Sequence, residues 1–167
     1  NAQYRDFTFG ALVDERIQAQ IDLLSSEQTF TVTTGHQLNL FTGPLYFLYK
    51  IFGTINLAEQ YKAQNPDYKF VPVFWMASED HDFEEISHFR TTDQKISWEK
   101  QAKGPVGRLK CTEMDGVMDA IKTLWSGSVI GQWMLDLFAA IYTPDMTLAA
   151  ATRKLVHEIF KDYPLLV

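Results

Sequence analysis

A nearly continuous apolar run, Phe70–Met76, is the sequence feature that most constrains the fold. Such runs are typical of a β-strand buried on both faces, as in a parallel sheet, and the Val, Phe and Trp side chains favour a strand here even though Pro72 removes one ladder donor. Upstream, Thr29–Thr33 predicts another strand, and Leu45–Tyr61, apolar on nearly every face, predicts a buried helix. Strand, helix and strand form a βαβ unit with a right-handed crossover, so the sequence predicts an α/β fold with a largely parallel sheet.

Helix and turn patterns continue on both sides of this unit. Ile86–Thr91 and Lys95–Gln101 are predicted to pair as a hairpin, and the glycines and proline of Lys103–Lys110 predict a loop. Amphipathic helices are predicted at Leu12–Leu24, Met114–Leu124, Gly131–Ile141 and Thr147–Lys161.

The last residues, Pro164–Val167, look like the first residues of another core strand. We therefore expect the chain to be a fragment of a longer protein. A sheet edge without its neighbour invites pairing, so the fragment alone is expected to be marginally stable and to self-associate.

Composition narrows the class of protein. Hydrophobic residues make up 46% of the chain and charged residues 22%, as in a globular domain, and the net charge of -6 argues against a nucleic-acid surface. The single cysteine, Cys111, gives no internal disulfide and is expected to be a small buried hydrophobe. No apolar run could span a bilayer and no signal peptide is visible, so no membrane association and a cytoplasmic location are expected.

The first loop that could carry chemistry is Thr34–Pro44, between the first strand and the long helix. Backbone N–H groups at a helix start can bind an anion, and Gly35 and Gly43 would let a ligand approach the backbone closely. The pattern is neither a dinucleotide fingerprint nor a Walker loop. A well-capped loop, with Thr42 as the cap, is an equally good interpretation.

The second loop, Ala77–Glu85, follows the apolar strand directly and holds five acidic residues and His81. Such a group can support acid–base chemistry or bind a metal, although most charge runs are solvated turns. Both loops should leave parallel strands at the same sheet edge, where ligands of α/β proteins bind. Lys50 either extends to solvent or reaches an anion near the first loop.

Three segments resemble the bacillithiol biosynthesis cysteine-adding enzyme family, BshC. They are TGHQLNLFTGPLYFLYK at Thr34–Lys50, PVFWMASEDHDFEEI at Pro72–Ile86 and GPVGRLK at Gly104–Lys110. The resemblance implies a Rossmann-like core of which residues 1–167 are a part, an insertion around residues 92–146, and a long coiled coil outside this chain.

The resemblance also implies an activity. Family members are ligases that join the carboxyl group of cysteine to the amino group of glucosaminyl-malate, a step in the biosynthesis of a bacterial low-molecular-weight thiol. Cysteine and glucosaminyl-malate are therefore the expected small-molecule partners, and a homo-oligomer is expected at full length. Amide formation needs an activated carboxyl group, so a nucleotide (ATP/ADP) is the expected cofactor, and no metal is predicted.

The resemblance assigns roles to individual residues. Asp80 or Asp82, with His81, would deprotonate the attacking amine or orient substrate amino groups. Many members have Gln at the position of His36, which favours Gln37 and the Gly35 backbone as binding groups. The full set predicted to bind substrate or phosphate is Gly35, His36, Gln37, Asn39, Thr42, Gly43, Lys50, Ser78, Glu79 and Arg108.

Two other functions fit the residues. A metal-dependent hydrolase could use Glu79, Asp80, His81 and Asp82, although zinc hydrolases generally use more than one His. A non-catalytic binding module could keep the same ligand pocket. Metal analysis separates the hydrolase from the ligase, and a turnover assay separates both enzymes from the binding module.

Overall fold

The computed structural model describes residues 15–167, so the first part of the predicted helix Leu12–Leu24 lies outside the described residues. The chain divides into two compact units. Among the described residues, the first comprises residues 15–36, 46–76 and 156–167, and the second comprises residues 37–45 and 77–155. Each unit is made of segments that are distant in sequence.

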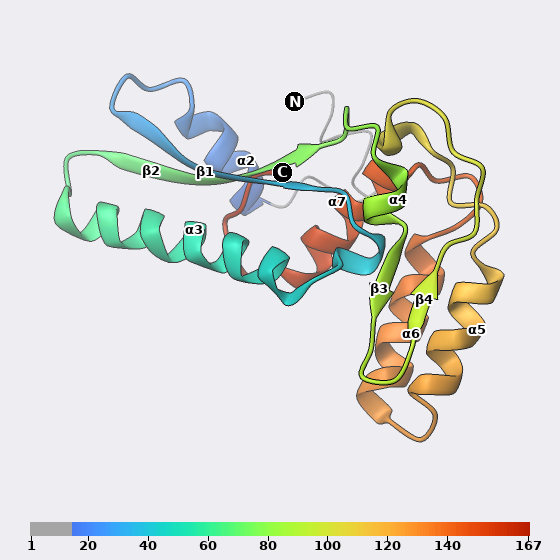
Figure 1. Cartoon of the computed structure of the whole chain (residues 1–167). Coiled ribbons are helices and arrows are strands. Elements are labelled where there is room, and N and C mark those ends of the chain that lie inside the picture. Colours follow the sequence, from blue (N-terminus) through green and yellow to red (C-terminus); the bar gives the residue numbers. More distant parts are fainter. Residues whose placement is uncertain (1–14) are drawn as a thin grey trace. The chain divides into compact units, whose positions relative to one another are not determined.

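The first unit contains the predicted βαβ arrangement (Figure 1). The strands β1 and β2 are neighbours in one sheet and run in the same direction, and the helix α3 connects them. The elements are α2 (Glu15–Leu23), β1 (Thr29–Gln37), α3 (Leu45–Gln64), β2 (Lys69–Ala77) and the end of α7 (Leu148–Ile159). Two parallel strands joined by a helix are an α/β arrangement, so the predicted α/β class is confirmed.

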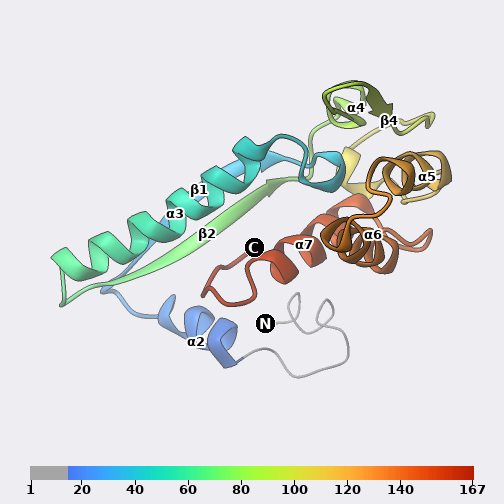
Figure 2. The same ribbon diagram turned by 90° about the horizontal axis from the view of Figure 1, so that it is seen from below.

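Apolar side chains pack on both faces of this sheet. On one face, Phe47 and Ile51 of α3 pack with Phe74 of β2 and Phe160. On the other face, α2 covers Val71, as the view from below shows (Figure 2). Burial on both faces is the reason that β2 reads as a continuous apolar run.

The C-terminal segment that was predicted to begin a strand forms one β-bridge with β2. The amide of Leu166 donates to the carbonyl of Pro72 (3.0 Å), and its carbonyl accepts from the amide of Phe74 (2.8 Å). These hydrogen bonds make a parallel bridge between Val73 and Leu166. Pro72 takes part in this bridge as a carbonyl acceptor, a role that does not need the N–H that proline lacks.

Two predictions about the first unit are wrong in part. The strand β1 continues through Thr34–Gln37, which was predicted as loop, because pairing with β2 extends it. The helix α3 is not buried all round: Tyr46 and Tyr49 are 62% and 63% exposed.

The second unit contains the predicted hairpin and helices. The strands β3 (His88–Arg90) and β4 (Lys95–Ser97) pair antiparallel, with Phe89 opposite Ile96. Trp98 follows β4, is buried, and donates from Nε1 to the carbonyl of Thr112 (2.8 Å). The remaining elements are η1 (Leu40–Thr42), α4 (Phe83–Ile86), η2 (Val106–Arg108), α5 (Asp115–Leu124), α6 (Val129–Ile141) and the start of α7.

Residues 92–146, where an insertion into the core was predicted, all belong to the second unit, and the insertion itself stays a prediction. Within residues 15–167, every helix is too short or too polar to cross a membrane.

Candidate functional site

Asp80 lies at the centre of the candidate site, in the loop after β2. Its Oδ2 accepts a hydrogen bond of 2.6 Å from Nε2 of Gln37. Its Oδ1 accepts from the backbone amides of His81 (2.6 Å) and Asp82 (3.1 Å). These hydrogen bonds, with that from Gln37 the strongest influence, lower the pKa of Asp80 below its ordinary value of 3.8. The carboxylate is therefore a fixed negative charge at neutral pH.

The hydrogen bond between Gln37 and Asp80 joins the two predicted loops across 43 residues of sequence. Gln37 is the last residue of β1, and Asp80 follows the parallel strand β2 closely. The prediction that both segments meet at the same sheet edge is therefore confirmed. Nε2 of Gln37 also donates to Oε2 of Glu85 (3.1 Å), so one amide group connects two carboxylates. Sequence reasoning did not select Glu85.

The third family-like segment contacts the second loop through the backbone. The amide of Val106 donates to the carbonyl of Asp80 (2.7 Å), and the amide of Gly107 donates to the carbonyl of Ser78 (3.0 Å). A Cβ atom on Gly107 would lie 2.6 Å from Cβ and O of Ser78, so only glycine fits there. Ser78 therefore takes part in this contact through its backbone carbonyl. The next residue after Gly107, Arg108, has an exposed side chain.

Asp82 has a structural task at the start of α4. Its Oδ1 accepts from the amide of Glu85 (3.1 Å), which makes it the N-cap of this short helix. An acidic residue three positions before Glu is close to a capping box, so the sequence contained this signal. The predicted catalytic role of Asp82 stays a prediction. The side chains of His81 and Glu79 are exposed.

The first loop is anchored by apolar side chains. Leu38 and Leu40 are fully buried, and Phe41 is 8% exposed. The ring of Phe41 stacks on Phe138, with centroids 4.3 Å apart and planes at 4°, and meets the edge of Tyr142 at 4.7 Å. The segment LNLF is thus an anchor in the aromatic core of the second unit.

The backbone turns sharply after this anchor. Phe41, Thr42 and Gly43 have φ of 50°, 76° and 64°, which is unfavourable for the first two residues. Gly43 is required, because its Cβ would lie 2.5 Å from Cβ of Asn39. Asn39 is buried and donates from Nδ2 to the carbonyl of Gln37 (3.3 Å). Asn39 and Gly43 therefore shape the loop.

Thr42 does not cap the long helix, contrary to the alternative prediction. The helix α3 begins at Leu45, so the residue before it is Pro44. Thr42 lies three positions before Leu45, in the turn with positive φ, because the tight loop places an extra turn ahead of the helix.

Three other predicted residues belong to the first unit. The ammonium of Lys50 donates to the carbonyl of Gly35 and lies 5.5 Å from the centroid of the Tyr46 ring. It thus reaches the first segment, although its partner is a carbonyl rather than an anion. The His36 ring meets that of Phe47 at 5.5 Å. A Cβ on Gly35 would make only ordinary contacts with Trp75 at 3.6–3.7 Å, so packing does not require glycine there.

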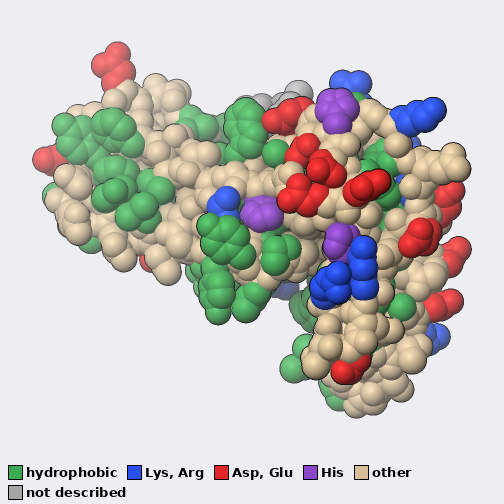
Figure 3. All heavy atoms as spheres, viewed as in Figure 1, with side chains coloured by type: hydrophobic (Ala, Val, Ile, Leu, Met, Phe, Trp, Pro, Cys, Tyr) green, Lys and Arg blue, Asp and Glu red, His purple; other side chains and the backbone are tan. Residues whose placement is uncertain are grey.

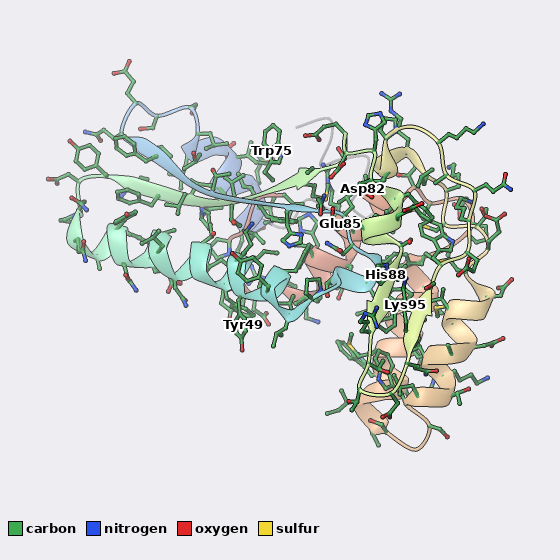
Figure 4. All side chains as sticks on the ribbon, in the orientation of Figure 1. Tyr49, Trp75, Asp82, Glu85, His88 and Lys95 are labelled. Atoms are coloured by element: carbon green, nitrogen blue, oxygen red, sulfur yellow. The ribbon has the colours of Figure 1, made fainter. Side chains whose placement is uncertain are left out.

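An open groove of about 990 Å³ lies beside Asp80 in the second unit. Acidic side chains gather on the surface around α4, where Asp82 directly precedes the helix and Glu85 lies within it (Figures 3 and 4). Lys95 also lines the groove. Sequence reasoning missed Lys95, because only the β3–β4 hairpin brings it close to the second loop. The lining residues are Asp80, His81, Asp82, Phe83, Glu84, Ser87, Lys95, Ser97, Trp98, Glu99, Lys100 and Ala102.

Among the residues that the structure describes, no group of three or more His, Cys, Asp or Glu side chains is arranged to hold a metal ion. Cys111 is buried, and burial raises the pKa of its thiol from 9.0 to about 11. As predicted, it packs as a small hydrophobe.

Comparisons with known proteins identify the domain. A family model described as the N-terminal Rossmann-like domain of bacillithiol biosynthesis BshC matches residues 1–167. A relative from Flavobacterium psychrophilum is 47% identical over 99% of this chain. Relatives from Flavobacterium johnsoniae and Cytophaga hutchinsonii are 46% and 45% identical over 93% and 99% of it. All three carry the name "Putative cysteine ligase BshC".

The alignments cover only part of each relative, namely 30%, 29% and 29% of their lengths. This chain thus spans about a third of a typical relative and corresponds to one domain. The family match covers every segment on which the predicted resemblance rested, from Thr34 to Lys110. The chain therefore belongs to the BshC family and corresponds to its N-terminal Rossmann-like domain.

Proposed function

We propose that a protein carrying this domain at the length of its relatives is a ligase that joins the carboxyl group of cysteine to the amino group of glucosaminyl-malate. The family description and the names of the relatives support a cysteine ligase of bacillithiol biosynthesis. The observation that carries the proposal is the assembly of three family-like segments at the second loop. Gln37 and Val106 donate to Asp80, and Gly107 donates to Ser78.

The groove beside Asp80 suits charged polar substrates. Cysteine has an ammonium and a carboxylate, and glucosaminyl-malate has an amino group and two carboxylates. In this proposal, Asp80 orients an amino group, and Lys95 in the same groove attracts a carboxylate. Because Asp80 holds its proton weakly, His81 takes the proton from the attacking amine.

The predicted nucleotide is part of the proposal for a chemical reason. A free carboxylate is a poor acyl donor, so one of its oxygens must leave with a phosphoryl or adenylyl group. The amine nitrogen then forms the C–N bond, and phosphate or AMP departs. Cysteine labelled with ¹⁸O in its carboxyl group distinguishes these routes, because the label appears in phosphate for an acyl phosphate and in AMP for an adenylate.

The proposal predicts that Asp80→Asn and His81→Gln slow the ligase in the full-length protein. The expected loss in kcat/KM is about 100-fold or more, since a positioned acid or base contributes roughly that factor. The assay measures amide formation from cysteine, glucosaminyl-malate and ATP by mass spectrometry. Asp93→Asn, on the hairpin turn outside the groove, is the matched control and should keep the wild-type rate.

Two results would contradict parts of this proposal. Wild-type rates in both variants, with unchanged circular dichroism, would remove the second loop from the mechanism. Substrate binding without any amide product in the wild-type protein would favour a binding module instead.

A further inference from the structure

The outward face of α3 carries apolar side chains that nothing in the described part of the first unit covers. Tyr46, Tyr49, Leu57 and Tyr61 are 62%, 63%, 38% and 39% exposed. Tyr49 points away from the sheet (Figure 4), and hydrophobic side chains gather along this side of the molecule (Figure 3). With the exposed Gly53 between them, these residues form what we call the α3 stripe.

The spacing of the α3 stripe defines the size of its partner. Tyr46, Tyr49, Gly53, Leu57 and Tyr61 follow one another at intervals of three or four residues, so they share one side of the helix. From Tyr46 to Tyr61 there are 15 residue steps, or about 22 Å at the α-helical rise of 1.5 Å per residue. A small substrate would cover only a fraction of that length, whereas a packed helix would cover it all.

Gly53 lies at the middle of the α3 stripe, and packing within the unit does not require glycine there. Glycine is among the least favourable residues in a helix interior. A Cβ atom at this position would meet nothing within 4 Å, and the backbone of Gly53 is not left-handed. The missing side chain leaves room at the middle of the α3 stripe for the close approach of a second helix backbone.

The chemistry of the α3 stripe is that of a buried interface. Its five positions carry no charge, and three of them are tyrosines, a residue enriched at the centres of protein interfaces. The neighbouring charge, Lys50, turns its ammonium toward the carbonyl of Gly35 and lies over the Tyr46 ring. A helix could therefore pack along the stripe without burying a free ammonium.

The relatives supply a candidate for that helix. About 70% of the length of each relative lies outside the segment that this chain matches. We propose that, in the full-length protein, a helix from that remaining part of the same chain packs along the α3 stripe and crosses α3 at Gly53. The N-terminal Rossmann-like domain would then be joined to the rest of the protein through its outer helix as well as through the backbone.

Photo-crosslinking in the full-length protein tests the occupant. Tyr49 is replaced by p-benzoylphenylalanine, and Tyr68, which is 43% exposed and lies outside the stripe, receives the same replacement as the control. After irradiation, the cross-linked peptides are identified by mass spectrometry. We expect Tyr49→p-benzoylphenylalanine to link within one chain to a peptide from outside the matched segment. A link between two copies, or no link, would overturn the proposal.

Substitution at the crossing point tests the same contact independently. Gly53→Leu should lower the melting temperature of the full-length protein, because the added side chain holds the two helices apart. Gly116→Leu is the matched control, since Gly116 is also a helical glycine whose Cβ would meet nothing within 4 Å. It should leave the melting temperature unchanged or raise it. An equal rise for both variants would show that Gly53 faces solvent.

Discussion

At the scale of single residues, Asp80 is fixed at both its backbone and its side chain. Its carbonyl accepts from Val106, and its two carboxylate oxygens accept from Gln37 and from the next two amides. An acid held by three donors prefers its ionised form. The acidic loop therefore has one member whose charge is constant across the physiological range and whose direction is set by the fold.

We predict that Gln37→Met raises the pKa of Asp80 toward 3.8, because the side-chain amide of Gln37 is the main cause of the lowered value. Titration of the carboxyl carbon by NMR measures the change. Thr143→Val is the control, because it removes the hydrogen bond that lowers the pKa of Asp145 and should leave Asp80 unaffected. An unchanged Asp80 pKa in Gln37→Met would mean that the amides of His81 and Asp82 suffice.

The lowered pKa of Asp80 also predicts the direction in which the stability of the fold changes with pH. The pKa of Asp80 is lower in the folded chain than in the unfolded one, so its ionised form stabilises the fold above pH 3.8. That contribution is lost as the pH falls through the folded value. Between neutral pH and a pH below 3.8, the free energy of unfolding of Gln37→Met should therefore fall less than that of the wild type.

At the scale of elements, the first loop owes its shape to its own packing. Phe41 is buried against Phe138 and Tyr142, and this contact holds residues with positive φ in place. The two glycines of the segment consequently differ. Gly43 has φ of 64° and packs against Asn39, whereas Gly35 lies in a strand with ordinary room for a methyl group.

We predict opposite effects for the two Gly→Ala changes. Gly43→Ala should destabilise the protein by about 1–3 kcal/mol, through overpacking and an unfavourable φ. Gly35→Ala should be neutral or stabilise by about 0.5 kcal/mol, because alanine loses less backbone entropy than glycine in a strand. Chemical denaturation of both variants measures the difference. Equal losses would mean that the Gly35 backbone is under a constraint that its contacts do not reveal.

Much of the element order was predictable because it rests on local periodicity. The apolar run of β2, the long α3 and the three C-terminal helices each extend over enough residues for their patterns to be read. The end of β1 was not predictable, because Gly35 and His36 are typical of loops and only their pairing with β2 places them in a strand. The exposed face of α3 was also missed, since an apolar residue does not indicate whether its partner lies in the same domain.

The site was predictable to a similar extent. The loops that hold Asp80 and Gln37 were selected because both were predicted to leave parallel strands at the same sheet edge. The family resemblance then singled out these two residues within the loops. Glu85 and Lys95 were missed because their places depend on a four-residue helix and a short hairpin, whose orientation has no signature in the sequence.

At the scale of the whole molecule, the single cysteine, Cys111, makes the stability of the second unit depend on pH. Burial raises the pKa of Cys111 to about 11 in the folded chain, from 9.0. A raised pKa means that the neutral thiol stabilises the fold below pH 9 and that this contribution is lost as the pH rises toward 11. We predict that the free energy of unfolding of the wild type falls more steeply over that range than that of Cys111→Val. Parallel slopes would show that the thiol is solvated.

The division into two units has a consequence for dissecting this protein. The chain passes between the units after residues 36, 45, 76 and 155, so neither unit is a continuous stretch of sequence. A proteolytic or recombinant piece covering residues 77–155 would hold Asp80, the groove and Phe138, but it would lack Gln37 and Phe41. Such a piece would lose both the amide that orients the central carboxylate and the ring that completes the aromatic core. Domain boundaries for expression therefore cannot be placed at the edges of the acidic loop without removing part of the site.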